Sequence, residues 1–254
     1  MLRAIGPRPA DIFLEIGPGR AALTRLLVAA AAHVIAVEID RDLAAGLRSD
    51  SPPGLTVLEG DFLSFTADRL GDVLAAARIP AATPLRVAGN LPYNVASPIL
   101  FKLLDLRSGG LPLVDATVML QREVAARLLA PPGTRDYGVL SILVQHQAHV
   151  AHRLALPPGA FRPVPKVAST LVRLDFHLPE PTPLSSPTFT ALTKAIFTRR
   201  RKTLANALSA FKLTEKLTAR DALRAAGIDG ARRPETLTIV ELVQLSDAFA
   251  RAVL

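Results

Sequence analysis

Short apolar runs alternate with longer segments that carry apolar residues at helical spacing through the first half of the chain. The runs predict β-strands near 12–16, 33–38, 55–58, 85–89 and 114–120. The longer segments predict helices near 20–31, 41–48, 95–105 and 121–129. Strands that alternate with helices form a parallel sheet covered by helices. We therefore expect an α/β domain.

The pattern changes after about residue 137. A helix is predicted over 138–149, followed by strands over 151–156 and 168–176 with no helix between them. Neighbouring strands that lack a crossover helix pair antiparallel. We expect a late antiparallel hairpin at the edge of the sheet.

A proline-rich segment separates this region from the rest of the chain. Its sequence, PEPTPLSSP at 179–187, continues neither a strand nor a helix, because prolines lack an N–H donor and fix φ. Helical patterns dominate beyond it, and Thr238 with Glu241 predicts a capping box that opens the last helix. We predict a catalytic domain over 1–178, a linker over 179–187 and a helical domain over 188–254.

Composition adds a basic surface and excludes cysteine chemistry. The chain has 30 Lys and Arg against 22 Asp and Glu, and residues 180–254 hold 12 of the basic and 7 of the acidic side chains. A basic excess favours binding to a polyanion such as RNA. With no Cys, disulfides, cysteine-ligated zinc and a thiol nucleophile are excluded. No apolar run approaches the roughly 18 residues of a membrane span, so we expect a cytoplasmic protein with no membrane partner, and a monomer.

A glycine loop follows the first predicted strand. Residues 15–19 have the sequence EIGPG, and a helix is predicted to begin at once. Gly17 and Gly19 allow the backbone to approach a ligand closely, and a helix N-terminus offers free N–H groups. Glu38 ends the second strand, where a ribose-binding acid belongs. The spacing from Gly17 to Ala22 also fits a dinucleotide fingerprint, so a nicotinamide cofactor is an alternative.

Two carboxylates favour S-adenosylmethionine over a dinucleotide. Glu15 lies just before the glycines, where it would repel a pyrophosphate but suits the amino group and sulfonium of S-adenosylmethionine. Asp61 and Phe62 follow the third strand, and Asp61 is placed to accept a hydrogen bond from the adenine amino group of the cofactor. Carboxylates at three successive strand ends therefore outline one ligand.

The fourth strand ends in the sequence GNLPYN at 89–94. An adenine N6 is a poor nucleophile because the ring delocalises its lone pair. The Asn90 side-chain oxygen and the Leu91 carbonyl, presented by the fixed φ of Pro92, would accept hydrogen bonds from the two N6 hydrogens, while Tyr93 stacks on the base. In isolation these residues would be interpreted as a strand-ending turn. Their position after a glycine loop and two strand-end acids favours a target-adenine site.

These segments resemble those of the bacterial small-subunit (16S) rRNA adenine N6,N6-dimethyltransferase family, in the order of that family and over nearly the whole chain. The matching segments are FLEIGPG at 13–19, VIAVEID at 34–40, EGDF at 59–62, GNLPYN at 89–94, MLQREVAARLLA at 119–130, DYGVLSILVQ at 136–145, FRPVPKVAS at 161–169 and FTRRRKTLANAL at 197–208. The resemblance implies a Rossmann-like S-adenosylmethionine-dependent methyltransferase sheet with a small C-terminal all-helical domain. It also implies small-subunit rRNA, or a pre-small-subunit particle, as the substrate during ribosome biogenesis.

The resemblance assigns roles to individual residues. The residues implied for the cofactor are Glu15, Gly17, Gly19, Glu38, Asp61, Phe62 and Asn90. The residues implied for the target adenine are Asn90, Leu91, Pro92 and Tyr93, with Phe161 closing the other face of the base. Two aromatic rings around an extruded base offset its unstacking, at about 1–3 kcal/mol per base.

The sequence departs from the family pattern in two places. Relatives begin upstream with a Gln-Asn-Phe-Leu-type segment, and Ala168 replaces an Asp common after the Pro-Lys-Val motif. One alternative is therefore an RNA-binding ribosome-assembly factor with weak or lost catalysis. Another is a large-subunit rRNA adenine dimethylase of the macrolide-resistance type, over which PVPKV at 163–167 and RKTL at 201–204 favour the small-subunit family.

A basic run follows the linker, at a predicted helix start: Arg199, Arg200, Arg201 and Lys202. We expect it to bind RNA phosphates, and a solvated helix face is the alternative. Histidines at 146, 149 and 152 are spaced by three, but no carboxylate pattern completes a metal site, so we expect no metal.

Overall fold

The computed structural model describes residues 1–50, 52–157, 159, 167–209, 211 and 217–253. It divides into two compact units, which are described separately: Met1–Ala125 with Ala148–His177, and Ala126–Gln147 with Leu178–Leu254. The predicted linker at 179–187 begins next to the join at His177, and the segment Ala126–Gln147, which the sequence analysis assigns to the first domain, belongs to the second unit. None of the described helices is both long and apolar enough to cross a membrane.

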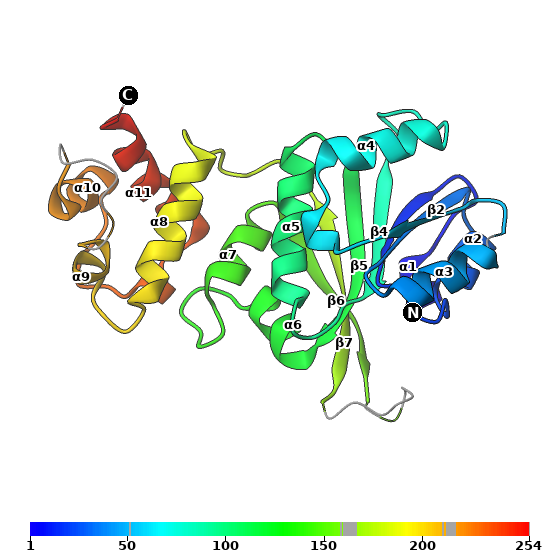
Figure 1. Cartoon of the computed structure of the whole chain (residues 1–254). Helices are drawn as coiled ribbons and strands as arrows, with labels where there is room; N and C mark the ends of the chain where they lie inside the picture. Colours follow the sequence, from blue (N-terminus) through cyan, green and yellow to red (C-terminus); the bar gives the residue numbers. More distant parts are fainter. Residues whose placement is uncertain (51, 158, 160–166, 210, 212–216, 254) are drawn as a thin grey trace. The chain divides into compact units, whose positions relative to one another are not determined.

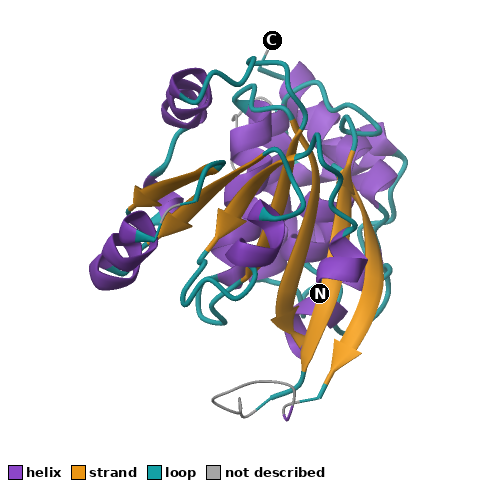
Figure 2. Cartoon of the chain, turned by 90° about the vertical axis from the view of Figure 1, so that its right-hand side faces the viewer, coloured by secondary structure: helices purple, strands orange, loops and turns teal. Residues whose placement is uncertain are grey.

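Seven strands form one sheet in the first unit, in the order β3-β2-β1-β4-β5-β7-β6, and Figures 1 and 2 show it from two sides. The first five strands pair in parallel, and β7 pairs antiparallel with both β5 and β6. The strands are β1 (Ile12–Ile16), β2 (His33–Glu38), β3 (Leu55–Glu59), β4 (Leu85–Asn90), β5 (Leu113–Gln121), β6 (Ala148–Leu156) and β7 (Ser169–Phe176). The α/β fold and its late antiparallel hairpin at the sheet edge are confirmed.

Helices pack against this sheet in the first unit. They are α1 (Leu2–Ile5), α2 (Thr24–Val28), α3 (Arg41–Ser49), α4 (Ala67–Ala76), α5 (Ala96–Ser108) and the start of α6 (Arg122–Leu129), with a 3-10 turn at Phe62–Ser64. Side chains at the helix starts accept bonds from free backbone amides: Asp40 caps α3 and Thr66 caps α4. Helices α1 and α4 were not predicted from the sequence.

Two predicted helices were too long. The helix predicted over 20–31 is only α2, because Ala21 has a φ of 63°, a left-handed conformation that a helix does not contain. The helix predicted over 138–149 is α7 (Val139–Gln145), and β6 begins at Ala148 instead of 151. Residues 148–150 belong to β6 because Ala148 pairs with Phe176 in the β6–β7 ladder. Local periodicity carries no information about that long-range pairing.

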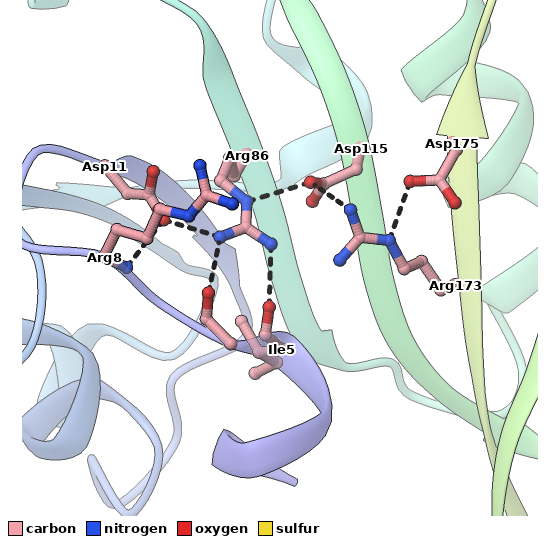
Figure 3. A network of polar contacts seen from close by, with 8 residues as sticks. Ile5, Arg8, Asp11, Arg86, Asp115, Arg173 and Asp175 are labelled. Carbon is pink, nitrogen blue, oxygen red and sulfur yellow. Dashed lines mark hydrogen bonds and ion pairs between the residues drawn. The ribbon is translucent and has the colours of Figure 1, made fainter.

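A partly buried ion network joins the amino ends of β4 and β5 to the carboxyl end of the antiparallel β7, at the edge of the sheet opposite the glycine loop. Arg86 donates to Asp11 and Asp115, and Arg173 donates to Asp115 and Asp175 (Figure 3). Arg86 also donates to the backbone carbonyl of Ile5, which ends α1. The network therefore ties the N-terminal segment to the central strands.

The second unit is helical. It contains α7, α8 (Ser186–Thr198), α9 (Leu204–Leu208), α10 (Ala219–Ala226) and α11 (Ile239–Arg251), with a 3-10 turn at Pro234–Thr236. Helices α8 to α11 contact one another around buried residues such as Phe189 and Phe249. The predicted capping box of Thr238 and Glu241 is present at the start of α11. The expected helical C-terminal region is confirmed.

Candidate active site

The glycine loop after β1 has the conformation that a close-bound ligand requires. Gly17 and Gly19 have φ values of 67° and 55°, which side-chain-bearing residues adopt only at a cost. A Cβ added at either glycine would meet nothing within 4 Å. The Gly17 amide donates to the Val37 carbonyl at 3.0 Å, which ties the loop to β2. Open space beside a backbone held in this way fits the predicted cofactor cradle.

Glu38 closes the loop from the next strand. Its Oε2 accepts from the Gly19 amide at 2.9 Å and its Oε1 accepts from the Asp40 amide at 3.0 Å. The side chain is buried at the carboxyl end of β2. The predicted ribose-binding acid therefore also shapes the glycine loop, a role that the sequence did not indicate.

Glu15 is a buried carboxylate on β1, only 1% exposed, and its Oε2 has no hydrogen-bond partner among the described residues. Burial raises the pKa of Glu15 to about 7; the nearby Thr24 hydroxyl lowers it and the Glu38 carboxylate raises it further. A cation bound beside Glu15 would favour its ionised form. The site therefore fits a positively charged ligand at this position.

The Glu15 carboxyl predicts a pH-dependent stability. Between pH 4.5 and about 7 the folded protein holds a proton on Glu15 that the unfolded chain has lost, so the contribution of Glu15 to the free energy of unfolding falls as pH rises through this window and is level above it. The total fall is about 3 kcal/mol. Glu15→Gln should abolish it, as measured by urea unfolding at pH 5 and pH 8. The exposed Glu59→Gln, at the end of β3, is the control and should keep the fall; a fall of equal size in Glu15→Gln would exclude Glu15 as its source.

Asp61 and Phe62 begin the turn that follows β3. The Asp61 Oδ1 accepts from the Leu63 amide at 2.9 Å, and Phe62 is 5% exposed. Ile39, directly after Glu38, is 68% exposed, and it was not predicted from the sequence as a site residue. The sequence could have marked Ile39 as a ligand contact, because an apolar residue after a strand-end acid is unusual in a solvated turn.

The loop after β4 places the predicted target-adenine residues together. Just before this loop, Gly89 is required within β4, since an added Cβ would lie 2.7 Å from the Ile16 carbonyl. Asn90 is exposed at the strand end, while Leu91 is 1% exposed and its amide donates to Met119 at 3.2 Å. Pro92 is exposed and Tyr93 is half-buried. Phe161 lies outside the described residues.

Adjacency in the sheet brings the two groups together. Strands β3, β2, β1 and β4 are consecutive neighbours, and the register pairs Ile16 with Val37 and Gly89, and Glu38 with Glu59. Neighbouring parallel strands lie about 4.8 Å apart. Four adjacent strand ends thus carry the predicted cofactor residues and the Asn90 loop along one edge of the sheet, where α/β proteins bind ligands.

A cavity of about 260 Å³ lies beside the glycine loop, between α2 and α3. Its lining includes Gly19, Thr24 and Leu47 but none of the other predicted cofactor residues. We therefore do not identify it with the cofactor position. In the described part of the chain, no group of three or more His, Cys, Asp or Glu side chains could hold a metal ion.

The basic run lies in the second unit and forms the turn between α8 and α9, so the predicted helix start was wrong. It lines a cavity of about 510 Å³ together with Thr198, Asn206 and Ser209. Arg200 differs from its neighbours, because its Nη2 donates to the Thr134 carbonyl at 3.0 Å and its Nε lies 3.7 Å from Glu235. Arg200 is thus engaged within the unit, whereas positions 199, 201 and 202 are exposed, and the Arg199 side chain makes a 3.4 Å bond to the Ser209 hydroxyl.

Known proteins share both the sequence and the fold. A family model described as "Ribosomal RNA adenine dimethylase" matches residues 1–249. The chain is 45% identical over 253 residues to Ribosomal RNA small subunit methyltransferase A of Anaeromyxobacter dehalogenans strain 2CP-C, covering 97% of this chain and 86% of that relative. It is 41% identical over 250 residues to the protein of the same name from Acinetobacter baylyi, covering 97% and 85%.

Two solved structures support the fold. A dimethyladenosine transferase from Plasmodium falciparum matches with a TM-score of 0.78 at 24% identity, over 99% of this chain and 94% of that one. The 23S rRNA methyltransferase ErmE matches with a TM-score of 0.62 at 24% identity, over 98% and 96%.

Proposed function

The chain belongs to the ribosomal RNA adenine dimethylase family, and from that membership we propose which of its residues carry out the reaction. It is an S-adenosylmethionine-dependent rRNA adenine N6,N6-dimethyltransferase that acts on small-subunit (16S) rRNA in ribosome biogenesis. The observation that carries the residue assignment is the row of adjacent strand ends from β3 to β4. Because of this membership, we set aside the three alternatives: a nicotinamide cofactor, a large-subunit rRNA substrate, and an assembly factor without catalysis.

The cofactor residues are proposed on the geometry of the glycine loop. Gly17 and Gly19 offer open backbone, and Glu38 presents a carboxylate beside them. Asp61 and Phe62 provide an acceptor and an apolar surface at the next strand end for the adenine ring, and we add the exposed Ile39 to that surface. When bound, S-adenosylmethionine supplies an electrophilic methyl group. Glu15 compensates its positive charge from beneath the loop.

Asn90, Leu91, Pro92 and Tyr93 are proposed to hold the target adenine. The Asn90 side-chain oxygen and the Leu91 carbonyl accept hydrogen bonds from the two N6 hydrogens and so localise the nitrogen lone pair, while Tyr93 and Phe161 stack on the base. The bound cofactor would supply the methyl carbon, and the bond from N6 to that carbon would form as its carbon–sulfur bond breaks. A proton then leaves N6 for solvent, and no strong base is required because the nitrogen becomes acidic only after transfer.

The finer assignments of partner and place are also proposals. Residues 1–178 would hold the cofactor and residues 188–254 would contact RNA, with a pre-small-subunit particle as the natural substrate. The net charge of +8 supports an RNA partner. A monomer in the cytoplasm is the expected form.

Glu38→Gln tests the cofactor assignment. Loss of the charge should weaken S-adenosylmethionine binding by about 1 kcal/mol, because a charge-assisted bond to the ribose hydroxyls becomes a neutral one and the difference between the two is lost. Isothermal titration measures the dissociation constant directly. Glu59→Gln is the matched control at the neighbouring strand end and should bind as the wild type does. If the two variants bind equally well, Glu38 does not hold the cofactor.

The RNA-binding role of the basic run is tested with a variant that leaves Arg200 in place, because Arg200 donates to the Thr134 carbonyl within the unit. Neutralising Arg199, Arg201 and Lys202 together should lower the log–log salt slope of RNA binding by about 0.7–0.9 for each phosphate that the variant no longer neutralises. Cofactor binding should be unchanged, and the methylation defect should shrink as RNA concentration rises.

The control for this variant removes the same charge elsewhere in the second unit: Lys194→Gln, Arg220→Gln and Arg224→Gln, all at exposed positions. The salt slope of the control should stay close to that of the wild type. Equal slopes in the two triple variants would mean that overall charge, and not the turn, binds RNA.

A further inference from the structure

The side chain of Tyr93 connects two strand ends that are not neighbours. Tyr93 follows β4, and its Oη lies 3.0 Å from the Oγ of Ser169, the first residue of β7. In the sheet order, β5 lies between β4 and β7. The tyrosine ring therefore spans the carboxyl end of β5, along the edge where the target adenine is proposed to bind.

Ser169 is a well-held anchor for this ring. Its backbone pairs with Gln121 of β5 on one side and with Leu156 of β6 on the other, and the residue is 1% exposed. A tyrosine ring is oriented by two torsions, χ1 and χ2. A hydrogen bond at the far end of the ring restricts both, and because Ser169 is buried and the pair is part-buried, water screens the bond only in part.

We propose that Ser169 is a positioning residue for methyl transfer, which holds the Tyr93 ring in the plane on which the target adenine stacks. This inference rests on the proposed role of the Asn90–Tyr93 loop. If the Tyr93 ring is already held in one orientation before the base binds, no conformational freedom is lost when the base stacks on it. The alignment of N6 with the methyl group depends on that fixed orientation. The second transfer depends on it more, because N6-methyladenine has a single N–H left for the Asn90 and Leu91 acceptors.

A double-mutant cycle tests the proposal: Ser169→Ala, Tyr93→Phe and the double variant. Each removes the hydroxyl pair and keeps the ring. The measured quantities are the single-turnover rate with undermethylated small subunits, the dissociation constants for S-adenosylmethionine and for small subunits, and the ratio of monomethylated to dimethylated adenine by nucleoside mass spectrometry. Ser97→Ala, a half-buried serine in the first turn of α5, is the control.

We expect each single variant to lower the rate roughly 3- to 10-fold, in line with the net contribution of one hydrogen bond. The double variant should be no slower than the slower single variant, both dissociation constants should be unchanged, and monomethylated adenine should accumulate. The control should behave as the wild type. A wild-type rate in Ser169→Ala, or rate reductions that multiply in the double variant, would overturn the proposal.

Tyr93→Ala separates this inference from the function on which it rests. If Tyr93→Ala abolishes transfer while Ser169→Ala is silent, only the positioning role of Ser169 fails. If Tyr93→Ala itself transfers methyl at the wild-type rate, the proposed base-binding role of the loop fails first.

Discussion

Asn90→Ala is expected to reduce methyl transfer on the order of 100- to 1,000-fold, while the dissociation constant for S-adenosylmethionine changes far less, although the resemblance also assigns Asn90 to the cofactor. The side-chain oxygen of Asn90 aligns the target amine at the moment when charge develops on N6, and removal of one such preorganised group costs about that much in other enzymes. Asn90 is exposed at the end of β4, so its truncation leaves no cavity in the core.

The measurement compares single-turnover rates with labelled cofactor and undermethylated small subunits against cofactor titration by calorimetry. Asn94→Ala provides the matched control, because Asn94 is an exposed asparagine in the same loop. Its rate should stay close to that of the wild type. Parallel reductions of rate and cofactor affinity in Asn90→Ala would show that the side chain acts mainly on the cofactor.

Local sequence was informative where one strand and the turn after it decide the structure. The run IFLEI fills β1, where every residue is buried, and the two glycines that follow adopt the positive φ values that glycine favours. The same holds for β2 with Glu38 and for β4 with Asn90. Because the carboxyl ends of parallel strands share one edge, residues far apart in sequence could be predicted to meet there.

Hydrogen bonds between residues far apart in the chain could not be predicted from the sequence. Glu38 was predicted to bind a ligand, but its bond to the Gly19 amide depends on how β1 and β2 lie in register. The bond between Tyr93 and Ser169 joins positions 76 residues apart, and no local pattern marks either hydroxyl as its partner. The division of the basic run, with Arg200 turned to the Thr134 carbonyl, likewise depends on tertiary packing.

Arg86 is the clearest case of a residue whose role only the fold reveals. A lone arginine in an apolar strand resembles an edge position, yet Arg86 is 8% exposed in β4, a central strand. Its Nε donates to Asp115 at 2.9 Å and its Nη1 donates to Asp11 at 2.5 Å. Its Nη1 and Nη2 also donate to the carbonyls of Gly6 and Ile5, at 3.1 and 2.7 Å (Figure 3).

Replacing Arg86 with Met should therefore lower the free energy of unfolding by about 3–5 kcal/mol, because two carboxylates lose their shared cation in a buried position. Burial already raises the pKa of Asp115, and Arg86 and Arg173 oppose that rise, so loss of Arg86 favours the protonated form of Asp115. The loss of unfolding free energy in Arg86→Met should consequently be smaller at pH 5 than at pH 8.

Urea unfolding at both pH values checks this expectation, with Arg48→Met as the control. The Arg48–Glu59 pair is 44% and 39% exposed, so its removal should cost no more than about 1 kcal/mol. Since Arg86 lies at the amino end of β4, opposite the proposed site, the variant should still bind S-adenosylmethionine under conditions where it remains folded. A destabilisation of Arg86→Met no larger than that of Arg48→Met would show that the network adds little to stability and that apolar packing alone holds the N-terminal segment on the sheet.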